Sequence, residues 1–355
     1  MKRVLKVGDK IYSQSLQHFV PSYLQGFPQR EQFLLKHMKD KIKFDFSRHK
    51  VIHNVADVIR ESKRLTKLLE GNSFDFIFVD NPFSALIIEN TIKIPIIFDC
   101  IDWYDEMYLK EYGVDKSYYL LRVGLLEVLE RASKVIVQSP IILESLKHWG
   151  LKTKDYTVIP NGFEKELFYP YPEKKNRRFK EKLSKKYKLD FKGKKIVVYT
   201  GKLSKWYENI KIIAEAIEDN QIFFVVGDGP LLNEIPNRAN IIKVGAVLLS
   251  EVPKYTNIAD VLVFPVDVDC SPIAISEYLA VGKPIVMGKG RMEWLLRNGR
   301  TGYMVDNNVN AWKKGILSAI QNKTRIKSFN LKLSKNLNWD YLAQKMVNFI
   351  NKKIQ

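Results

Sequence analysis

The chain has 355 residues, 46% of them hydrophobic and 12% aromatic, which favours a globular protein of two domains and excludes a disordered one. Its formal net charge is +19, from 58 Lys and Arg against 39 Asp and Glu. Such an excess favours a polyanionic partner, although a general bias of the proteome toward lysine gives the same number.

No apolar run approaches the roughly 18 residues that a membrane-spanning helix needs, and no long apolar segment follows the basic start. We therefore expect neither a transmembrane helix nor a signal peptide. Two cysteines, Cys100 and Cys270, do not make a disulfide framework and fit a reducing cytoplasm. No RNA-binding sequence motif, zinc-ligand spacing or helix-turn-helix signature accompanies the positive charge, so we expect no nucleic-acid partner.

Strand-like and helix-like segments alternate through the first half of the chain. We expect strands at 2–7, 74–79, 95–99, 134–138 and 156–159, and helices at 51–69, 83–92, 117–132 and 141–149. The region 13–46 mixes aromatic and basic residues, as does 103–119. Either region suits contact with an acceptor or a membrane, and either is equally explained by a core-facing aromatic side with a solvated basic side.

An acidic cluster follows the strand at 95–99. Asp99, Asp102 and Asp105 lie where ligands bind in α/β proteins, at the carboxyl end of a strand. Asp102 is the candidate for a base acting on an acceptor hydroxyl. A helix cap or an ordinary loop acid is the alternative for this residue.

A dense basic run separates the two halves. Residues 170–195 include KKNRRFKEKLSKKYKLDFKGKK, in which we expect an exposed helix at 178–188. A solvated face and a membrane-facing patch both remain open for it.

The second half repeats the strand and helix alternation, and glycines follow its strands. We expect strands at 196–200, 222–226, 241–244, 261–265, 284–287 and 302–305, with helices at 208–218, 250–260 and 310–322. Gly201, Gly227, Gly229 and Gly245 lie just after the first three of these strands, where backbone can approach a ligand closely.

The segment DCSPIAISEYLAVGKPIVMGK, residues 269–289, carries the most specific pattern. Ser271 is predicted to be the N-cap of a helix with Pro272 at its first position, followed by Ile273 and Ala274. Asp269 and Glu277 flank that helix start with seven residues between them. The N–H groups at a helix start favour a phosphate, and carboxylates accept hydrogen bonds from sugar and ribose hydroxyls. The order acid, helix start, acid therefore matches the order sugar, diphosphate, ribose in a nucleotide-sugar.

This segment resembles the donor-site signature of GT-B glycosyltransferases of the family 4 type. In that family the first acid, here Asp269, contacts the donor sugar and the second, here Glu277, binds the ribose. Asp269 and Cys270 replace the usual Glu and Gly. The segments GDGP at 227–230 and PNGF at 160–163 resemble the same family, and DCID at 99–102 resembles a segment of some GT-B enzymes, inverting ones included.

The resemblance implies further roles. Lys202 and Lys205 would reach the diphosphate, with Lys202 replacing the family's arginine, and Lys289 would reach a donor phosphate. The nucleotide-sugar is then a substrate, and no metal ion or other cofactor is required for the chemistry.

The expected fold is α/β of the GT-B type, two Rossmann-like domains facing across a cleft. We expect an acceptor and membrane-facing domain at 1–168, a basic connection at 169–194, a donor domain at 195–335 and a helix at 336–355 returning to the first domain.

The expected function is transfer of a sugar to a hydroxyl of a lipid-linked or cell-surface glycan precursor. The enzyme would be peripheral on the inner face of the cell membrane and bound to its anionic surface. Retention of anomeric configuration is slightly favoured over inversion. A GT-B nucleotide-sugar 2-epimerase and a non-catalytic partner subunit of a glycosyltransferase are the alternatives.

Overall fold

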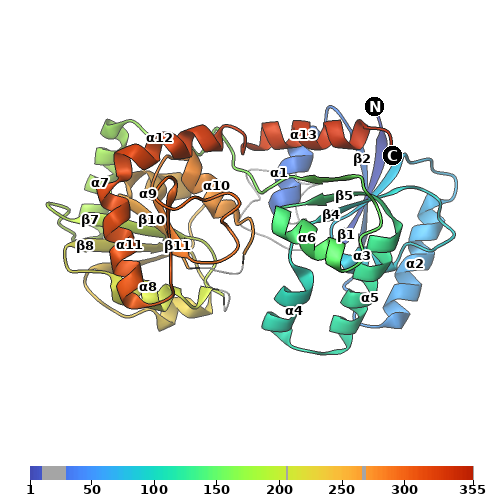
Figure 1. Ribbon diagram of the computed structural model, residues 1–355, viewed down its shortest axis with the longest axis horizontal. Helices are drawn as coiled ribbons and strands as arrows, with labels where there is room; N and C mark the ends of the chain where they lie inside the picture. Colours follow the sequence, from blue (N-terminus) through green and yellow to red (C-terminus); the bar gives the residue numbers. More distant parts are fainter. Residues whose placement is uncertain (10–28, 205–206, 266–268, 355) are drawn as a thin grey trace. The chain divides into compact units, whose positions relative to one another are not determined.

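A computed structural model describes residues 1–9, 29–204, 207–265 and 269–354 (Figure 1). The chain divides into two compact units. Unit 1 comprises Met1–Pro160 with Trp339–Gln355, and unit 2 comprises Asn161–Asn338. Residues 161–168 and 336–338 thus belong with unit 2, because Phe163 and Phe168 are buried in its core and the Phe163 N–H donates to the Leu337 carbonyl.

Unit 1 is built on a six-stranded sheet in the order β2-β1-β3-β4-β5-β6, with every pair parallel. Its strands are β1 (Arg3–Asp9), β2 (Lys43–His49), β3 (Phe76–Val79), β4 (Ile96–Cys100), β5 (Ala132–Val137) and β6 (Tyr156–Val158). β3 and β4 are buried at every position, as expected for the nearly continuous apolar runs of central parallel strands.

The helices of unit 1 flank this sheet. They are α1 (Gln29–Met38), α2 (Val55–Leu69), α3 (Pro82–Leu86), α4 (Tyr104–Tyr112), α5 (Lys116–Arg131), α6 (Pro140–His148) and α13 (Trp339–Asn351). Side-chain oxygens of Asn54, Asn81, Asp115 and Ser139 cap α2, α3, α5 and α6. α13 packs against α1, where the rings of Phe33 and Trp339 stack with their centroids 5.8 Å apart (Figure 1).

Unit 2 has a second six-stranded parallel sheet, in the order β12-β11-β10-β7-β8-β9. Its strands are β7 (Lys195–Thr200), β8 (Gln221–Val226), β9 (Ile241–Gly245), β10 (Val261–Phe264), β11 (Ile285–Gly288) and β12 (Gly302–Val305). The flanking helices are α7 (Glu173–Tyr187), α8 (Ile210–Ala216), η4 (Pro230–Glu234), α9 (Val252–Ile258), α10 (Ile273–Ala280), α11 (Val309–Gln321) and α12 (Lys323–Ser334).

Two parallel sheets with flanking helices confirm the predicted α/β architecture of two Rossmann-like halves. The basic segment at 169–194 contains α7, which belongs to unit 2 and begins at Glu173, five residues before the predicted start. Among the helices described here, none is both long and apolar enough to cross a bilayer.

Candidate functional site

Most of the predicted site residues meet at one edge of the unit 2 sheet. Because all six strands are parallel, their carboxyl ends lie together, and this is the edge where α/β sheets bind ligands. Gly201 and Lys202 follow β7, Gly227 and Gly229 follow β8, Gly245 ends β9, Asp269 follows β10 and Lys289 follows β11.

The glycines after β7 and β8 allow two backbone segments to touch. A Cβ on Gly227, whose φ is +143°, would lie 1.8 Å from the Gly201 carbonyl oxygen, and one on Gly229 would lie 2.5 Å from the Leu203 carbonyl oxygen. The Gly227 N–H donates to the Gly245 carbonyl at 2.9 Å, which ties in the end of β9. Any larger residue at Gly227 would force these loops apart, so the glycines fix the floor of the site.

Lys202 is held by its backbone while its side chain is exposed. The Tyr199 hydroxyl donates to the Lys202 carbonyl, and the next residue, Leu203, is fully buried. Lys202 can therefore extend a cation over the strand ends without moving the loop. Lys205, the second predicted cation, lies outside the described residues.

The loop before α10 is held by its own turn and by the start of unit 2. An Asp269 carboxylate oxygen accepts from the Ser271 N–H at 2.9 Å, and the Trp294 indole N–H donates to the Cys270 carbonyl at 2.9 Å. Asn161 contributes three bonds: its N–H donates to Ser271 Oγ at 2.9 Å, its side-chain amide to the Ser271 carbonyl at 2.6 Å, and its carbonyl accepts from the Ser276 hydroxyl at 2.6 Å.

The predicted cap of α10 is wrong. The residue before the helix is Pro272, it forms no side-chain cap, and Ser271 Oγ is engaged by Asn161 instead. The first turn of α10, at Ile273 and Ala274, therefore begins without a side-chain oxygen on its N–H groups. Such groups remain available to an anion.

Glu277 is a buried acid on α10. Its exposed fraction is 7%, and no described residue forms a hydrogen bond or ion pair with its carboxyl group. Burial raises the pKa of Glu277 to about 8. Burial also raises the pKa of Asp269, to about 6, against the hydrogen bonds from the Ser271 and Cys270 backbone that lower it. Glu277 thus lacks the compensation that buried carboxylates ordinarily have, whereas Asp269 receives part of it from these backbone N–H groups.

Tyr278, the residue after Glu277, has an anchoring role that the sequence did not predict. The Tyr278 hydroxyl is fully buried, accepts from the Thr200 N–H at 2.8 Å and so pins α10 to the end of β7. A lone tyrosine inside an apolar helix gives no signal of such a role. Asn161 could have been found, since it belongs to the PNGF segment.

Lys289 is an exposed residue whose ammonium lies 2.8 Å from the Asp306 carboxylate. A phosphate would have to displace that exposed ion pair, which costs little. Among the described residues, no group of three or more His, Cys, Asp and Glu side chains is placed to hold a metal ion.

Asp102 belongs to unit 1, whereas the residues described so far belong to unit 2. It follows β4, is half-buried, and its carbonyl accepts from Cys100 Sγ at 3.4 Å. It lines a pocket between β4, α4, α5 and α6, together with Cys100, Trp103, Tyr104, Asp105, Leu125, Ile142, Ser145, Leu146 and Trp149. A carboxylate among aromatic rings can accept a proton from a hydroxyl that enters the pocket.

Two buried ion pairs lie beneath the same strand ends of unit 1. The Lys6 ammonium lies 2.8 Å from the Asp80 carboxylate, and the Arg30 guanidinium contacts Asp99 through two nitrogens at 3.1 and 3.2 Å. Arg30 also donates to the Pro160 carbonyl at 2.9 Å, at the last residue of this segment of unit 1. Burial raises the pKa of Asp99 although Arg30 and Lys6 lower it. These pairs support the strand ends and were not predicted.

Comparison with known families gives two matches along the chain. Residues 26–167 match the family described as Glycosyltransferase Family 4, and residues 194–322 match the family described as Glycosyl transferases group 1. Together they cover more than half of the sequence.

Known proteins and structures agree with those matches. Alpha-monoglucosyldiacylglycerol synthase from Streptococcus pneumoniae is 27% identical over 249 residues, which cover 64% of this chain and 54% of that protein. The chain thus spans about half the length of that relative. Sucrose-phosphate synthase from Thermosynechococcus elongatus has a TM-score of 0.75 at 16% identity, covering 98% and 97% of the two chains. HepE from Anabaena, in complex with UDP and glucose, has a TM-score of 0.72 at 15% identity, covering 99% and 100%.

Proposed function

Because this chain belongs to the GT-B glycosyltransferases of the family 4 and group 1 type, we propose that it transfers a hexosyl group from a nucleotide-sugar to an acceptor hydroxyl. The donor lies at the strand ends of unit 2. The glycine floor at Gly201, Gly227 and Gly229 accommodates the nucleotide, and Gly245 lies beside its base.

The observation that carries this proposal is the buried Glu277 carboxyl group, which has no partner among the described residues. A group of this kind costs folding free energy unless a ligand satisfies it. Two adjacent ribose hydroxyls supply two donors and would hold it as a carboxylate.

The diphosphate needs positive charge as its bond to the sugar breaks. Lys202 is exposed at this edge, and the open N–H groups of Ile273 and Ala274 begin α10 after Ser271 and Pro272. We assign stabilisation of the departing diphosphate to these groups, with Lys205 and Lys289 as further cations and without a required metal ion.

Asp269 and Asp102 are the two acids assigned to the chemistry. Asp269 orients the donor sugar, and Asp102 accepts the acceptor proton, which requires an oxygen-to-oxygen distance of about 3 Å. Retention is favoured over inversion by the spacing of Asp269 and Glu277. The name of the Streptococcus relative specifies an alpha glucoside, which is what retention gives from an alpha-linked donor.

The acceptor is proposed to be a lipid or a lipid-linked glycan precursor. The Streptococcus relative is named for a glucosyldiacylglycerol, and the chain carries a net charge of +19 that suits an anionic cytoplasmic membrane face. Peripheral attachment there would bring the site to such an acceptor.

Thermal shift with a panel of UDP, GDP, ADP and their sugars tests the donor assignment, beginning with the UDP-glucose found in the Anabaena relative. The donor should stabilise the wild type. In Glu277→Ala the dissociation constant of the donor should be about 10- to 100-fold larger, because a hydrogen bond to a charged group is lost. Transfer to diacylglycerol in detergent then tests the activity, and NMR of the product anomer distinguishes retention from inversion. Isomerisation of the donor sugar without any acceptor would favour the epimerase alternative.

A further inference from the structure

Helix α7 has two chemically opposite sides. Phe179, Leu183 and Tyr187 face unit 2: the Phe179 ring meets the Tyr255 ring at 5.1 Å, and the Tyr187 ring meets the Phe224 ring at 6.3 Å. Leu183 is 3% exposed. This apolar side fixes the helix on α9 and β8, so its other side has a fixed direction.

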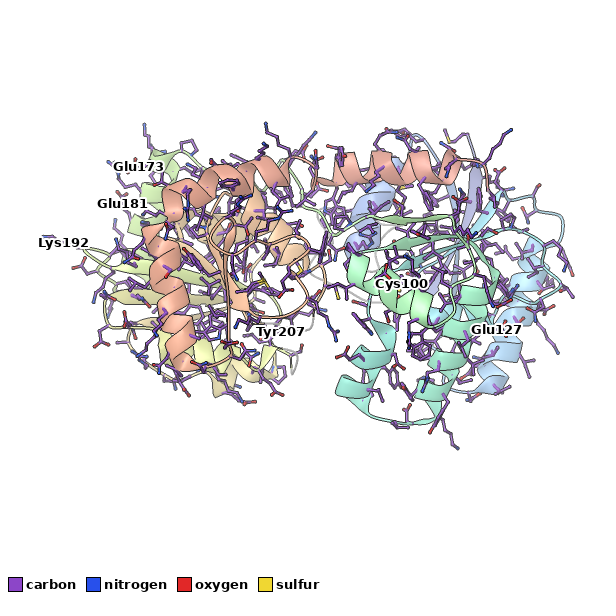
Figure 2. All side chains as sticks on the ribbon, in the orientation of Figure 1. Cys100, Glu127, Glu173, Glu181, Lys192 and Tyr207 are labelled. Atoms are coloured by element: carbon purple, nitrogen blue, oxygen red, sulfur yellow. The ribbon has the colours of Figure 1, made fainter. Side chains whose placement is uncertain are left out.

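The other side of α7 is basic. At 100° per residue, Lys174, Arg178, Glu181 and Lys185 fall on one stripe opposite Leu183, and the exposed Lys182 borders this stripe beside Arg178. The whole helix contains two acids, Glu173 and Glu181, which Figure 2 shows extending away from the unit. Against them stand eight basic residues: Lys174, Lys175, Arg177, Arg178, Lys180, Lys182, Lys185 and Lys186.

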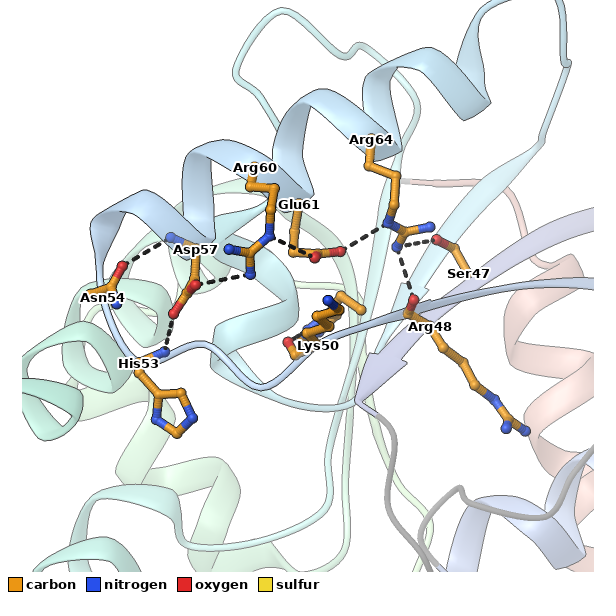
Figure 3. Close-up of polar contacts among 10 residues, drawn as sticks. Ser47, Arg48, Lys50, His53, Asn54, Asp57, Arg60, Glu61 and Arg64 are labelled. Atoms are coloured by element: carbon orange, nitrogen blue, oxygen red, sulfur yellow. Dashed lines mark hydrogen bonds and ion pairs between the residues drawn. The ribbon is translucent and has the colours of Figure 1, made fainter.

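None of these eight cations forms an ion pair with a described residue, in contrast to α2. There Arg60 lies 2.9 Å from Asp57, and Arg64 lies 2.9 Å from Glu61, so acids one turn away neutralise the arginines (Figure 3). α7 instead places like charges at i and i+4, as in Lys174 with Arg178, which destabilises a helix. Lys175 and Lys186 lie over the rings of Tyr171 and Tyr187, at 3.1 and 4.9 Å from the centroids, but no carboxylate of the described residues neutralises the basic side.

Lysines from other elements act electrostatically on the same region as Lys180 of α7. The pKa of Lys283 is lowered to about 8, chiefly by burial; Asp260 opposes the shift, and Lys180, Lys323 and Lys327 contribute to it. Asp260 itself is engaged, since its carboxylate accepts from Lys323 at 2.9 Å and from the Ile196 N–H at 3.0 Å. On α7 itself Glu173 and Glu181 offset only two of its eight basic residues.

We propose that the basic side of α7 is a docking surface for an anionic phospholipid bilayer. The stripe is straight, about 20 Å long, and carries no outward apolar or aromatic residue that would insert into the bilayer or stack on nucleic-acid bases. Binding is therefore electrostatic, depends on the fraction of anionic lipid and falls with salt. This inference rests on the proposed function, because a lipid acceptor gives the enzyme a membrane to work on.

Vesicle sedimentation of the full chain tests this docking surface. Wild type should bind vesicles of 40% phosphatidylglycerol in phosphatidylcholine, fail to bind pure phosphatidylcholine, and be released in 0.5 M NaCl. The variant Lys174→Gln/Arg178→Gln/Lys182→Gln/Lys185→Gln should partition at least about 100-fold more weakly, since each cation near such a surface contributes roughly fivefold. Its melting temperature should be unchanged or higher, because like-charge pairs are removed.

A control variant with the same change in net charge shows whether vesicle binding depends on where the removed cations lie or only on the total charge of the protein. Lys147, Lys152, Lys211 and Lys254 each pair with an exposed glutamate, and replacing these four by Gln should lower partitioning far less. Equal losses in both variants, or binding of wild type that is indifferent to phosphatidylglycerol, would overturn the proposal. So would retention of DNA through α7 with no vesicle binding.

Donor binding is measured separately by thermal shift with UDP-glucose in both variants. Unchanged donor binding with no α7-dependent vesicle binding would refute the docking surface and leave the glycosyltransferase assignment standing. Vesicle binding through α7 without any nucleotide binding would refute the glycosyltransferase assignment and leave the docking surface standing.

Discussion

The side-chain amide of Asn161 donates a hydrogen bond of 2.6 Å to the carbonyl of Ser271, which is 110 residues further along the chain. The Asn161 carbonyl in turn accepts from Ser276 on α10. The helix that carries Glu277 is thus held by the first residue of unit 2, and its position depends on the segment that follows Pro160.

Removing that amide should loosen the loop before α10. In Asn161→Ala the Ser271 carbonyl loses its donor in a buried position, so the free energy of unfolding should fall by about 1–3 kcal/mol. Urea denaturation measures this, and donor titration should show weaker binding. The exposed Asn220→Ala is the control and should stay within about 0.5 kcal/mol of wild type. Equal effects of the two changes would contradict the role of Asn161.

Gly227 should tolerate no side chain. A Cβ there would lie 1.8 Å from the Gly201 carbonyl oxygen, so Gly227→Ala combines overpacking of about 1–3 kcal/mol with the cost of an unfavourable φ. Gly245 is the matched control, since its φ is +81° but nothing lies within 4 Å of an added Cβ. Gly245→Ala should therefore lose only about 1–2 kcal/mol. Urea unfolding that ranks the two variants in the reverse order would refute this account.

Glu277 should make stability depend on pH. Its ordinary pKa is 4.5 and burial raises it to about 8, so between these values the folded state keeps a proton that the unfolded chain has released. The free energy of unfolding should then fall as pH rises, by up to about 1.4 kcal/mol per pH unit, and Asp269 adds to the fall up to about pH 6.

The test of that pH dependence is Glu277→Gln, which keeps the shape of the side chain and cannot ionise. Its stability relative to wild type should increase from pH 5 to pH 8, and the difference should shrink when a saturating donor nucleotide occupies the site. A constant difference across this range would show that the Glu277 carboxyl does not titrate as burial implies.

The buried pair of Lys6 and Asp80 should be sensitive to loss of one partner. Both side chains are almost fully buried, and Lys6→Met would leave the Asp80 carboxylate without its cation, at a cost of about 3–5 kcal/mol. Lys147→Met breaks an exposed pair with Glu144 and should cost no more than about 1 kcal/mol. Thermal unfolding compares the two, and equal shifts would contradict the difference in burial.

Strands were the most predictable part of this fold. Segments such as VLVF of β10 and FIFV of β3 are short, wholly apolar and rich in β-branched or aromatic residues, so one local pattern determines their burial on both faces. The strand β2 was not predicted, because its burial is partial and Lys, Asp, Ser and Arg interrupt its phenylalanines.

Helix α12 was also missed, for a related reason. Its buried residues are Ile326, Asn330 and Ser334, so its inner face is mostly polar and gives no apolar period. Asn330 instead donates to the carbonyls of Lys283 and Thr301, which are distant in the sequence. The spacing of apolar residues in the sequence predicts a helix face that is buried by apolar packing. It does not predict a face that is held by hydrogen bonds of polar side chains.

The backbone of the candidate site was predictable where a local motif fixes it, as at Gly227 and Gly229. It was not predictable where contacts distant in the sequence decide the outcome. Ser271 looks like a helix cap in isolation, and its hydroxyl is taken by Asn161. The partner of Lys289 and the anchoring role of Tyr278 are likewise set by tertiary neighbours.

The stacking of Trp339 on Phe33 bears on how the protein is made. The contacts of unit 2 are continuous from Asn161 to Asn338, so this unit can form while translation is still in progress. Unit 1 begins earlier but must wait for α13, which follows unit 2 in the chain, before its α1 side is covered. The half synthesised first is therefore completed second, and until then the apolar face of α1 is exposed to chaperones and proteases.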